Sequence, residues 1–507
     1  MAKYTAQVLK PVDEHRRKRL RAKEGADVEI KELPDKPEGM TWRDYVIMLL
    51  HIGCELEHGL MAQYLYAAYS LGGDHLSKED QEEVQDWQEL ILTVAREEMG
   101  HLLTVQNLLC LLGGPVTFDR ENFPWDSPFY PFPFNFEPLT RESLAAYVFA
   151  EMPGNFEFLD KLYRDAREGT DRAHIRDIEV PFLEETMKNW VEKADARPVG
   201  EVYHLVHDIL TKRDLIPSTD LRPDSYPFQS SWDDWGRGYR PNPSRPGSDE
   251  TKVDDNKANI IIERAATRTE ALYAIKEICG QGENPDLHPG RNHETSHYAR
   301  FLEVLRNYDR KLNESPDWNP ARQVPVNPVT ASTCDPENPP TGTTVISWPA
   351  SAKWADLFNC RYRMLLTFLT HTYRLARIVD PDEPNTRGAV MHRIFGEMYN
   401  LKAIAGILVR MPLVSPDDPR RAGPPFRMPY SLDLPSDEID CWRLHRDNIA
   451  YSRELCRALL DPANDCLDST PDEGEPFLRT LCNWDKKAAA WVEAVLDGLK
   501  GNGGHCS

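Results

Sequence analysis

Apolar residues recur at intervals of three and four along most of the chain, the pattern of helices that bury one face. The first such segment begins near Thr41 and is expected to end at Gly72-Gly73. The second begins at Ser77, a residue type that caps helix N-termini, and runs to Gly113-Gly114. Further helical patterns cover about 141–151, 155–167, 178–192, 199–213, 266–281, 293–308, 352–378, 387–411, 440–460 and 475–499. Because strand patterns are almost absent, the chain is predicted to be all-α, a helix bundle with additional C-terminal helices and long proline-rich loops.

Several segments between these helices lack periodicity. Residues 1–40 are highly charged and are predicted to form an arm without regular structure. Residues 123–136 alternate prolines with aromatic residues, which predicts either a loop packed across the bundle or a lid over an active-site mouth. The predicted organisation is an N-terminal arm at 1–40, a bundle with inserted loops at 41–312, a proline-rich linker at 313–351 and a C-terminal helical region at 352–507 that packs on the bundle.

Glu-x-x-His pairs are the sequence feature that points most directly to chemistry. Residues three apart share a helix face, so a carboxylate and an imidazole at this spacing can bind one metal ion. Ferritin-like di-iron bundles combine two such pairs with one glutamate from each of two other helices. One pair is expected by chance at this composition, so an isolated motif is weak. The chain has four: Glu55/His58, Glu98/His101, Glu201/His204 and Glu294/His297.

Two of the four pairs have a single glutamate at a matching height. Glu57 and Glu98 lie roughly 21 and 26 Å from the loop that joins their helices, at about 1.5 Å per residue, so antiparallel packing brings them to nearly the same level. Glu283 ends one predicted helix and Glu294 opens the next, so this pair also shares a level. The predicted metal ligands are therefore Glu57, Glu98, His101, Glu283, Glu294 and His297.

Two further residues are candidates for catalysis. Tyr64 follows Glu57 by two helical turns, so its phenol lies either beside the metal or in the core with a hydrogen-bonded hydroxyl. Glu151 ends the helix after the aromatic segment and is the reserve ligand or acid.

The remaining histidines are interpreted as structural. His58 follows Glu57 directly and so points about 100° away from it. Glu201 and His204 open a helix, where a glutamate favours the helix dipole. Three histidines in the C-terminal region show no acidic partner at ligand spacing and are interpreted as core or surface residues: His371, His392 and His445.

Around these motifs the chain resembles the ferritin-like family named for iminophenylpyruvate dimer synthase, whose domain occurs in violacein and chromopyrrolate pathway enzymes. The segments that carry the resemblance follow the family's order and span about 41–310. They are Glu55-Leu-Glu-His-Gly-Leu-Met-Ala-Gln-Tyr-Leu65, Ala95-Arg-Glu-Glu-Met-Gly-His101 with Gly113-Gly-Pro115, Phe149-Ala-Glu-Met-Pro153, Gly200-Glu-Val-Tyr203, Ile278-Cys-Gly-Gln-Gly-Glu283 and Ser296-His-Tyr-Ala-Arg-Phe301. A weaker likeness covers 358–362 and 387–411. Where the family often has a proline pair after the first motif, this chain has Met61-Ala-Gln63, and Pro217–Lys257 and Ser315–Ala350 look like additions.

The resemblance implies a ferritin-like four-helix bundle that holds two iron ions or another divalent metal. It also implies an oxygen-dependent oxidation of an amino-acid-derived imine or related intermediate in secondary metabolism, with an upstream amino-acid oxidase as partner. Imine coupling, N-oxygenation and desaturation all stay open. Two alternatives from other classes are an iron-storage protein and a metal-free scaffold subunit of a biosynthetic complex.

Composition limits the kinds of binding partner and the cellular location that can be expected. The net charge of −22 disfavours binding to nucleic acid or to an anionic membrane surface. The ten cysteines include no C-x-x-C motif, which argues against a zinc knuckle or a thioredoxin-type site. No secretory signal and no apolar run of about 18 residues is evident, so a cytoplasmic location is expected. The C-terminal region is expected to cap the bundle or to form a homo-oligomer contact.

Overall fold

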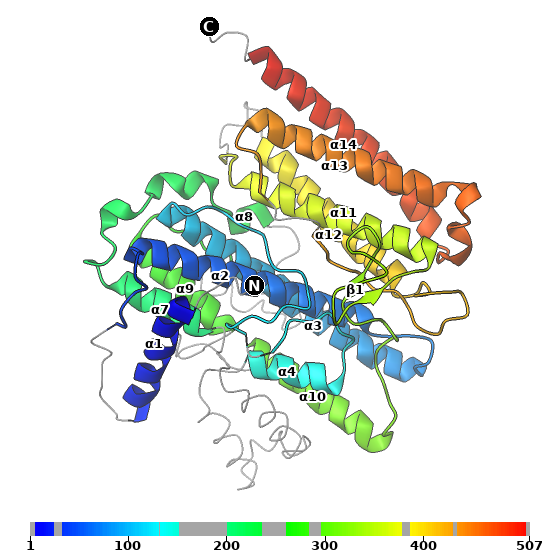
Figure 1. Cartoon of the computed structure of the whole chain (residues 1–507), viewed down its shortest axis with the longest axis horizontal. Helices are drawn as coiled ribbons and strands as arrows, with labels where there is room; N and C mark the ends of the chain where they lie inside the picture. The colour runs from blue at the N-terminus through cyan, green and yellow to red at the C-terminus, as the bar shows by residue number, and fades with distance from the viewer. Residues whose placement is uncertain are drawn as a thin grey trace, which may run out of the picture.

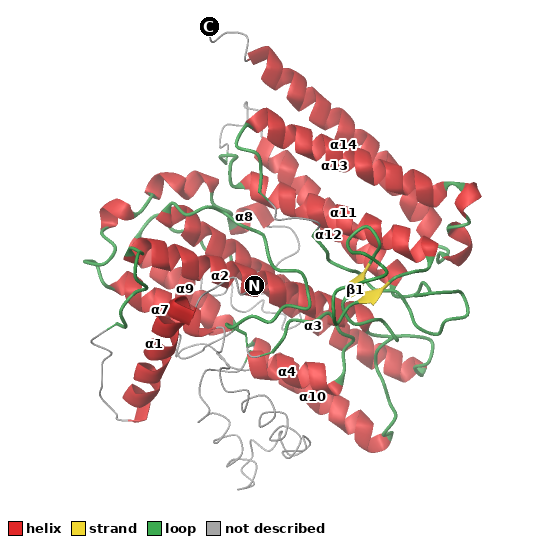
Figure 2. Cartoon of the chain, viewed as in Figure 1, coloured by secondary structure: helices red, strands yellow, loops and turns green. Residues whose placement is uncertain are grey.

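The computed structural model describes residues 6–24, 33–130, 132–151, 200–235, 260–282, 296–377, 386–428 and 433–502. Regular structure there is almost entirely helical, which confirms the all-α prediction (Figure 1, Figure 2). The helices are α1 Ala6–Glu24, α2 Trp42–Ser70, α3 Lys78–Leu112, α4 Arg141–Ala150, α7 Gly200–Thr211, α8 Trp232–Trp235, α9 Arg268–Gln281, α10 His297–Glu314, α11 Pro349–Thr372, α12 Thr386–Leu408, α13 Glu438–Leu460 and α14 Gly474–Asn502. Strands β1 Pro328–Val329 and β2 Thr344–Val345 form a short parallel pair. The helices predicted at about 155–167 and 178–192 lie outside the described residues.

Helices α2 and α3 form a long hairpin through the middle of the molecule, and its ends match the sequence signals (Figure 1). Thr41 caps α2 in a capping box with Asp44. Ser77 caps α3 by accepting a hydrogen bond from the backbone N–H of Asp80. Gly113 ends α3 in the left-handed conformation, with φ of 65°, which glycine adopts without steric cost. The local sequence therefore fixes where the two longest helices of the bundle begin and end.

The shorter helices cover one side of this hairpin, and the C-terminal helices cover the other (Figure 1). Helix α7 packs on α2, α9 packs on α7 and α3, and α10 packs on α4 and α3. All of these elements share one hydrophobic core with the C-terminal helices. The arrangement leaves the inner faces of α2 and α3 looking toward the ends of α4, α9 and α10.

The aromatic segment 123–136 packs against the bundle. Phe134 stacks on Trp125 with ring centroids 5.0 Å apart and on Tyr130 at 4.0 Å. A methyl group at Gly59 of α2 would lie 3.0 Å from the Phe134 ring, so glycine at this position permits the close approach of the loop. Of the two predictions for this segment, these contacts support the packed loop.

Helices α11 to α14 form a second helical layer with a charged centre. Arg361 of α11 is fully buried and contacts Glu397 of α12 at 2.9 Å and Asp485 of α14 at 2.7 Å. Ser452 of α13 donates to Asp485 at 2.8 Å. Each of the four helices thus contributes one member of a buried polar cluster, which ties them in one arrangement.

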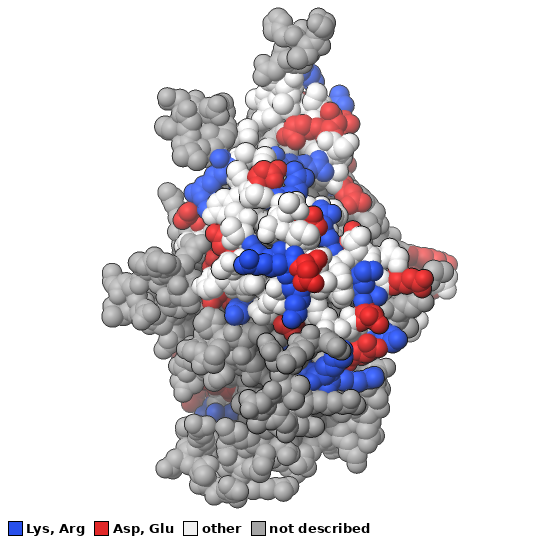
Figure 3. Space-filling model, turned by 90° about the vertical axis from the view of Figure 1, so that its left-hand side faces the viewer, with Lys and Arg blue, Asp and Glu red and all other residues white. Residues whose placement is uncertain are grey.

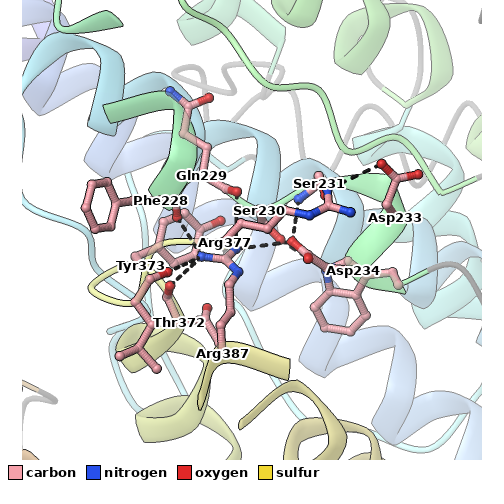
Figure 4. Close-up of polar contacts among 12 residues, drawn as sticks. Phe228, Gln229, Ser230, Ser231, Asp233, Asp234, Thr372, Tyr373, Arg377 and Arg387 are labelled. Atoms are coloured by element: carbon pink, nitrogen blue, oxygen red, sulfur yellow. Dashed lines mark hydrogen bonds and ion pairs between the residues drawn. The ribbon is translucent and has the colours of Figure 1, made fainter. Parts of the chain in front are cut away.

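A second arginine joins this layer to the segment before α8. Arg387, at the start of α12, donates to the backbone oxygen of Thr372 at 2.6 Å and to that of Gln229 at 3.1 Å, and it contacts Asp234 at 3.2 Å (Figure 4). Arg377 donates to Ser231 at 3.0 Å beside it. These contacts hold the end of α11, the start of α12 and residues 228–235 together.

The prediction that residues 1–40 lack regular structure was wrong for residues 6–24, which form α1. Helix α1 packs on α7, and polar pairs contribute beside the buried Val12. His15 contacts Asp208 at 2.9 Å, and Arg19 donates to Glu201 at 3.0 Å. An interface built from charged side chains leaves little apolar periodicity in the sequence, which is why the pattern did not indicate this helix.

The described surface is mixed in charge. On the face drawn in Figure 3, lysine and arginine side chains are interspersed with aspartate and glutamate. Among the described helices, none combines the length and the apolar character that crossing a membrane requires.

Candidate metal centre

Helices α2 and α3 bring three of the predicted ligands together. His101 Nδ1 lies 2.9 Å from Glu98 Oε2 and 3.5 Å from Glu57 Oε2. Ligand atoms of these three buried residues all lie within 4.8 Å of one another, a separation that one metal ion can bridge. Glu57 and Glu98 therefore share a level, as their positions along the two helices indicate.

A second group adjoins the first and shares Glu98 with it. His297, the first residue of α10, places Nδ1 2.7 Å from Glu98 Oε1 and 3.6 Å from Glu151 Oε2. Ligand atoms of Glu98, Glu151 and His297 also lie within 4.8 Å of one another. The two oxygens of Glu98 thus turn toward different histidines, so this carboxylate lies between two groups of metal-ligand type.

Both histidines present the same ring nitrogen to the carboxylates. Their Nδ1 atoms face the carboxylates, while Nε2 of His101 is 3.1 Å from Gln281 Oε1 and Nε2 of His297 is 3.0 Å from Glu97 Oε2. A hydrogen-bond acceptor beside Nε2 favours the histidine tautomer that is protonated at Nε2. In that tautomer Nδ1 is unprotonated and can bind a metal ion. Arg300 donates to the same oxygen of Glu97 at 2.8 Å, which holds that carboxylate in place.

The carboxylates have hydroxyl partners on the outer side of the two groups. Tyr203 of α7 donates to Glu57 Oε1 at 2.5 Å, and Tyr64 of α2 donates to Glu151 Oε1 at 2.5 Å. Each tyrosine leaves the other oxygen of its carboxylate turned toward a histidine. These contacts fix the carboxylate orientations before any ion arrives.

The five residues of the two groups are each at most 1% exposed, and several of their polar atoms lack an ordinary partner. Among the described residues, four such atoms make no hydrogen bond: Glu57 Oε2, Glu98 Oε1, Glu151 Oε2 and His297 Nδ1. Leaving buried polar atoms unpaired is costly, and native proteins rarely do so without a reason. Cations held between the two groups would satisfy all four of these atoms.

The pKa values of the ionisable groups also favour a bound cation at this site. Burial raises the pKa of Glu57 to about 7, against the opposing effect of His101. Burial also opposes ionisation of Glu98, but the nearby His297 and His101 lower its pKa below the usual value. Burial opposes protonation of His101, yet its contacts with Glu57 and Glu98 raise its pKa to about 10. Without metal the groups therefore retain protons, which a bound metal ion would displace.

The donor chemistry fits iron or a similar ion. Carboxylate oxygens and imidazole nitrogens suit iron, manganese and zinc, and a buried carboxylate-rich set stabilises the higher charge of ferric iron. Gly282 borders the space between the groups, because a methyl group there would lie 3.3 Å from the rings of both His101 and His297.

Two of the predicted ligands, Glu283 and Glu294, lie outside the described residues, and their role stays a prediction. Glu151, expected as a reserve ligand or acid, lies within the second group. His58 points away from both groups and contacts the hydroxyl of Tyr362 in α11. Glu201 accepts a hydrogen bond from Arg19 of α1.

The sequence reasoning missed three residues that contact the groups: Glu97, Tyr203 and Gln281. Glu97 directly precedes Glu98 on α3, so helix periodicity alone would turn it away from the same ion. Tyr203 and Gln281 belong to segments that carry the family resemblance, which is the signal that could have marked them.

Comparisons with known proteins show what the chain is similar to. A family model described as ferritin-like matches residues 50–306, which include all five residues of the two groups. The chain is 25% identical over 419 residues to a dichlorochromopyrrolate synthase from Lentzea aerocolonigenes, covering 76% of this chain and 36% of that protein. The chain thus spans about a third of the length of this relative. A crystal structure of a ferritin-like protein from Caulobacter vibrioides is similar with a TM-score of 0.37 and 16% identity, covering 71% of this chain and 95% of that one.

Proposed function

The chain belongs to the ferritin-like family, and from that premise we propose that it is a di-iron, oxygen-dependent oxidase or oxygenase of secondary metabolism. The proposed substrate is an amino-acid-derived small molecule. The similarity to a synthase that makes a chromopyrrolate supports an enzyme of biosynthesis over other roles of the family.

The observation that carries the proposal is the position of Glu98 between two histidines that both offer Nδ1. One ion would be held by Glu57, Glu98 and His101, and the other by Glu98, Glu151 and His297. A carboxylate shared by two such groups is the arrangement that a pair of ions requires, whereas a single ion would leave one group unused. Bound there in the ferrous state, the pair supplies electrons for the reduction of dioxygen.

The protein's own residues would orient the ligands and handle protons. Burial raises the pKa of Tyr64 well above its usual value, with the charge of Glu151 adding to the effect, so the phenol keeps its proton and donates a hydrogen bond to Glu151. Burial also raises the pKa of Glu151, and the charge of Glu98 acts in the same direction. Tyr64 and Glu151 thus form a pair that can hold a proton beside the proposed metal pair.

Aromatic rings exclude water on the Tyr64 side. The Tyr64 ring lies 5.0 Å from that of Tyr147 and 4.8 Å from that of Phe301, and all three residues are buried. A dry wall of this kind protects reactive intermediates from water and strengthens the electrostatic interactions inside the site.

The proposed substrate is an imine or related intermediate, and the proposed partner is an amino-acid oxidase that supplies it. Both follow from the family resemblance and from the biosynthetic relative. Imine coupling, N-oxygenation and desaturation are each compatible with this chemistry. The helical layer α11 to α14 is proposed to cap the bundle or to join two copies of the chain.

Metal loading followed by oxygen uptake tests the proposal. Purified chain, freed of metal and loaded anaerobically with Fe²⁺, is expected to retain about two iron ions. Beyond the oxygen that oxidises the loaded Fe²⁺, it should consume oxygen only when an amino-acid-derived imine is present. A Glu98→Ala/His101→Ala variant should retain neither property. Glu82→Ala, which changes an exposed glutamate of the same helix, serves as the matched control.

Each rival function gives a different result in the same assay. An iron-storage protein would take up iron and consume oxygen without any organic substrate. If the chain were a metal-free scaffold, the wild type and the double variant would bind the same negligible amount of iron. Either result would reject the proposed oxidase.

A further inference from the structure

A second cluster of metal-ligand type lies in the helical layer α11 to α14, where the end of α11 meets the start of α13. His371 Nε2 is 3.0 Å from Glu438 Oε1. Glu438 and Cys441 are three residues apart on α13 and so share its face. One ligand atom from each of His371, Glu438 and Cys441 lies within 4.8 Å of the others. His371 is buried, as expected of a core histidine, and its acidic partner is not at ligand spacing in the sequence but comes from a different helix.

A second histidine contacts the ring nitrogen of His371 that faces away from Glu438. His371 Nδ1 is 2.9 Å from Nε2 of His445, one helical turn beyond Cys441 on α13. The His445 ring is 1% exposed and stacks on Phe368 with centroids 4.3 Å apart. In this contact His445 Nε2 can accept a hydrogen bond from the Nδ1–H of His371. A metal-binding histidine commonly donates its second ring N–H in this way, which leaves its other nitrogen free.

We propose that His371, Glu438 and Cys441 bind a divalent transition-metal ion of the zinc type, separate from the ions of the bundle. Thiolate, imidazole and carboxylate are the three ligand kinds that zinc takes in proteins, and the sulfur disfavours magnesium and calcium. The Glu438 side chain is 39% exposed, whereas His371 is fully buried, so the fourth position opens to water on the Glu438 side. Binding releases the thiol proton of Cys441 and any proton on His371 Nε2.

One neighbouring cation bears on the choice of ion. Arg374 Nη1 lies 3.2 Å from Cys441 Sγ, and its Nη2 donates to the backbone oxygen of Leu434 at 3.1 Å. Burial raises the pKa of Cys441, and the nearby guanidinium acts in the opposite direction. Because the Arg374 guanidinium repels cations, the site requires an ion that bonds strongly to sulfur. This requirement again favours zinc over magnesium.

The metal would connect two helices that are far apart in the sequence. His371 precedes Glu438 by 67 residues, and α11 also packs on α12 while α13 packs on α14. An ion at this junction would fasten the two helix pairs of the C-terminal layer to each other. The inferred effect is therefore a link between the helix pairs, separate from the oxidative chemistry proposed for the bundle.

Cobalt substitution tests this site without reference to enzyme activity. Full-length chain freed of metal and titrated with Co²⁺ is expected to show a thiolate-to-cobalt charge-transfer band whose final intensity corresponds to one cobalt–thiolate site per chain, and the band should disappear when Zn²⁺ is added. Cys441→Ser should abolish the band. Cys482→Ser, a half-buried thiol of α14, should retain it. His445→Ala should weaken cobalt binding roughly 10- to 100-fold, because it removes the group that orients His371.

The bundle ligands provide the second control. In the described residues the two groups of the bundle contain only carboxylates and imidazoles, so the Glu98→Ala/His101→Ala variant should keep the band. Circular dichroism would show that each variant is folded. Absence of the band in folded wild type, its persistence in Cys441→Ser, or its equal loss in Cys482→Ser would each overturn the proposal.

Discussion

Replacing Tyr203 by phenylalanine is expected to weaken metal binding at one position of the pair and spare the other. The substitution removes the hydroxyl that donates to Glu57 Oε1 at 2.5 Å. The ring itself should stay in place, because it packs so closely on α2 that a methyl group at Gly53 would lie 2.9 Å from the hydroxyl oxygen. The change therefore isolates one hydrogen bond to a metal-facing carboxylate.

The size of the effect follows from that contact. A hydrogen bond to a charged group contributes about 1.5–3 kcal/mol, which corresponds to a roughly 10- to 100-fold change in Kd. Loss of a group that orients a metal ligand has a similar effect. Because Tyr203 contacts Glu57 and Tyr64 contacts Glu151, only the ion held by Glu57 and His101 should bind more weakly.

Equilibrium dialysis of metal-free chain against Fe²⁺ under anaerobic conditions would measure this. Wild type should fill both positions, whereas Tyr203→Phe should fill one position at low Fe²⁺ and the second only at higher concentration. The control is Tyr147→Phe, which removes a buried hydroxyl that makes no hydrogen bond among the described residues. Equal binding curves for wild type and Tyr203→Phe, or an equal loss in Tyr147→Phe, would refute the reasoning.

Three further predictions concern proton handling and stability. Tyr64→Phe should retain iron but slow oxygen consumption, since it removes the hydroxyl that donates to Glu151; an unchanged turnover rate would contradict this. Burial raises the pKa of Glu137 to about 7, so the free energy of unfolding should fall as pH rises from about 4.5 to 7. Glu137→Gln carries no titrating carboxyl group and should reduce this loss by about 1–3 kcal/mol, as measured by urea unfolding at pH 8. Asp485→Asn should lower the free energy of unfolding by about 3 kcal/mol because it leaves Arg361 with one fewer buried partner, whereas Asp497→Asn should not.

Much of the fold could be predicted because its signals are local. The capping residues Thr41 and Ser77 and the terminal glycine Gly113 act through their own backbone neighbours, so their positions in the sequence locate the helix ends directly. Helix α1 was missed for the opposite reason. Its packing depends on the pairing of His15 and Arg19 with residues nearly two hundred positions away, which no local pattern reveals.

Part of the candidate site could likewise be predicted from local sequence, and part of it could not. The shared level of Glu57 and Glu98 follows from helix rise and a short connection, both of which the sequence shows. The contacts of Tyr203 and Gln281 depend on how α7 and α9 pack against the hairpin, and tertiary packing of this kind has no signature in the spacing of residues. The partnership of His371 with Glu438 is another contact between helices that are distant in the sequence.

The most direct test of the central claim is anomalous diffraction from iron-loaded crystals of the chain, with data collected above and below the iron absorption edge. The account predicts two anomalous peaks roughly 3.5–4 Å apart, one beside Glu57 and His101 and one beside Glu151 and His297, with Glu98 contacting both. A single peak, no peak, or peaks that do not contact Glu98 would contradict it.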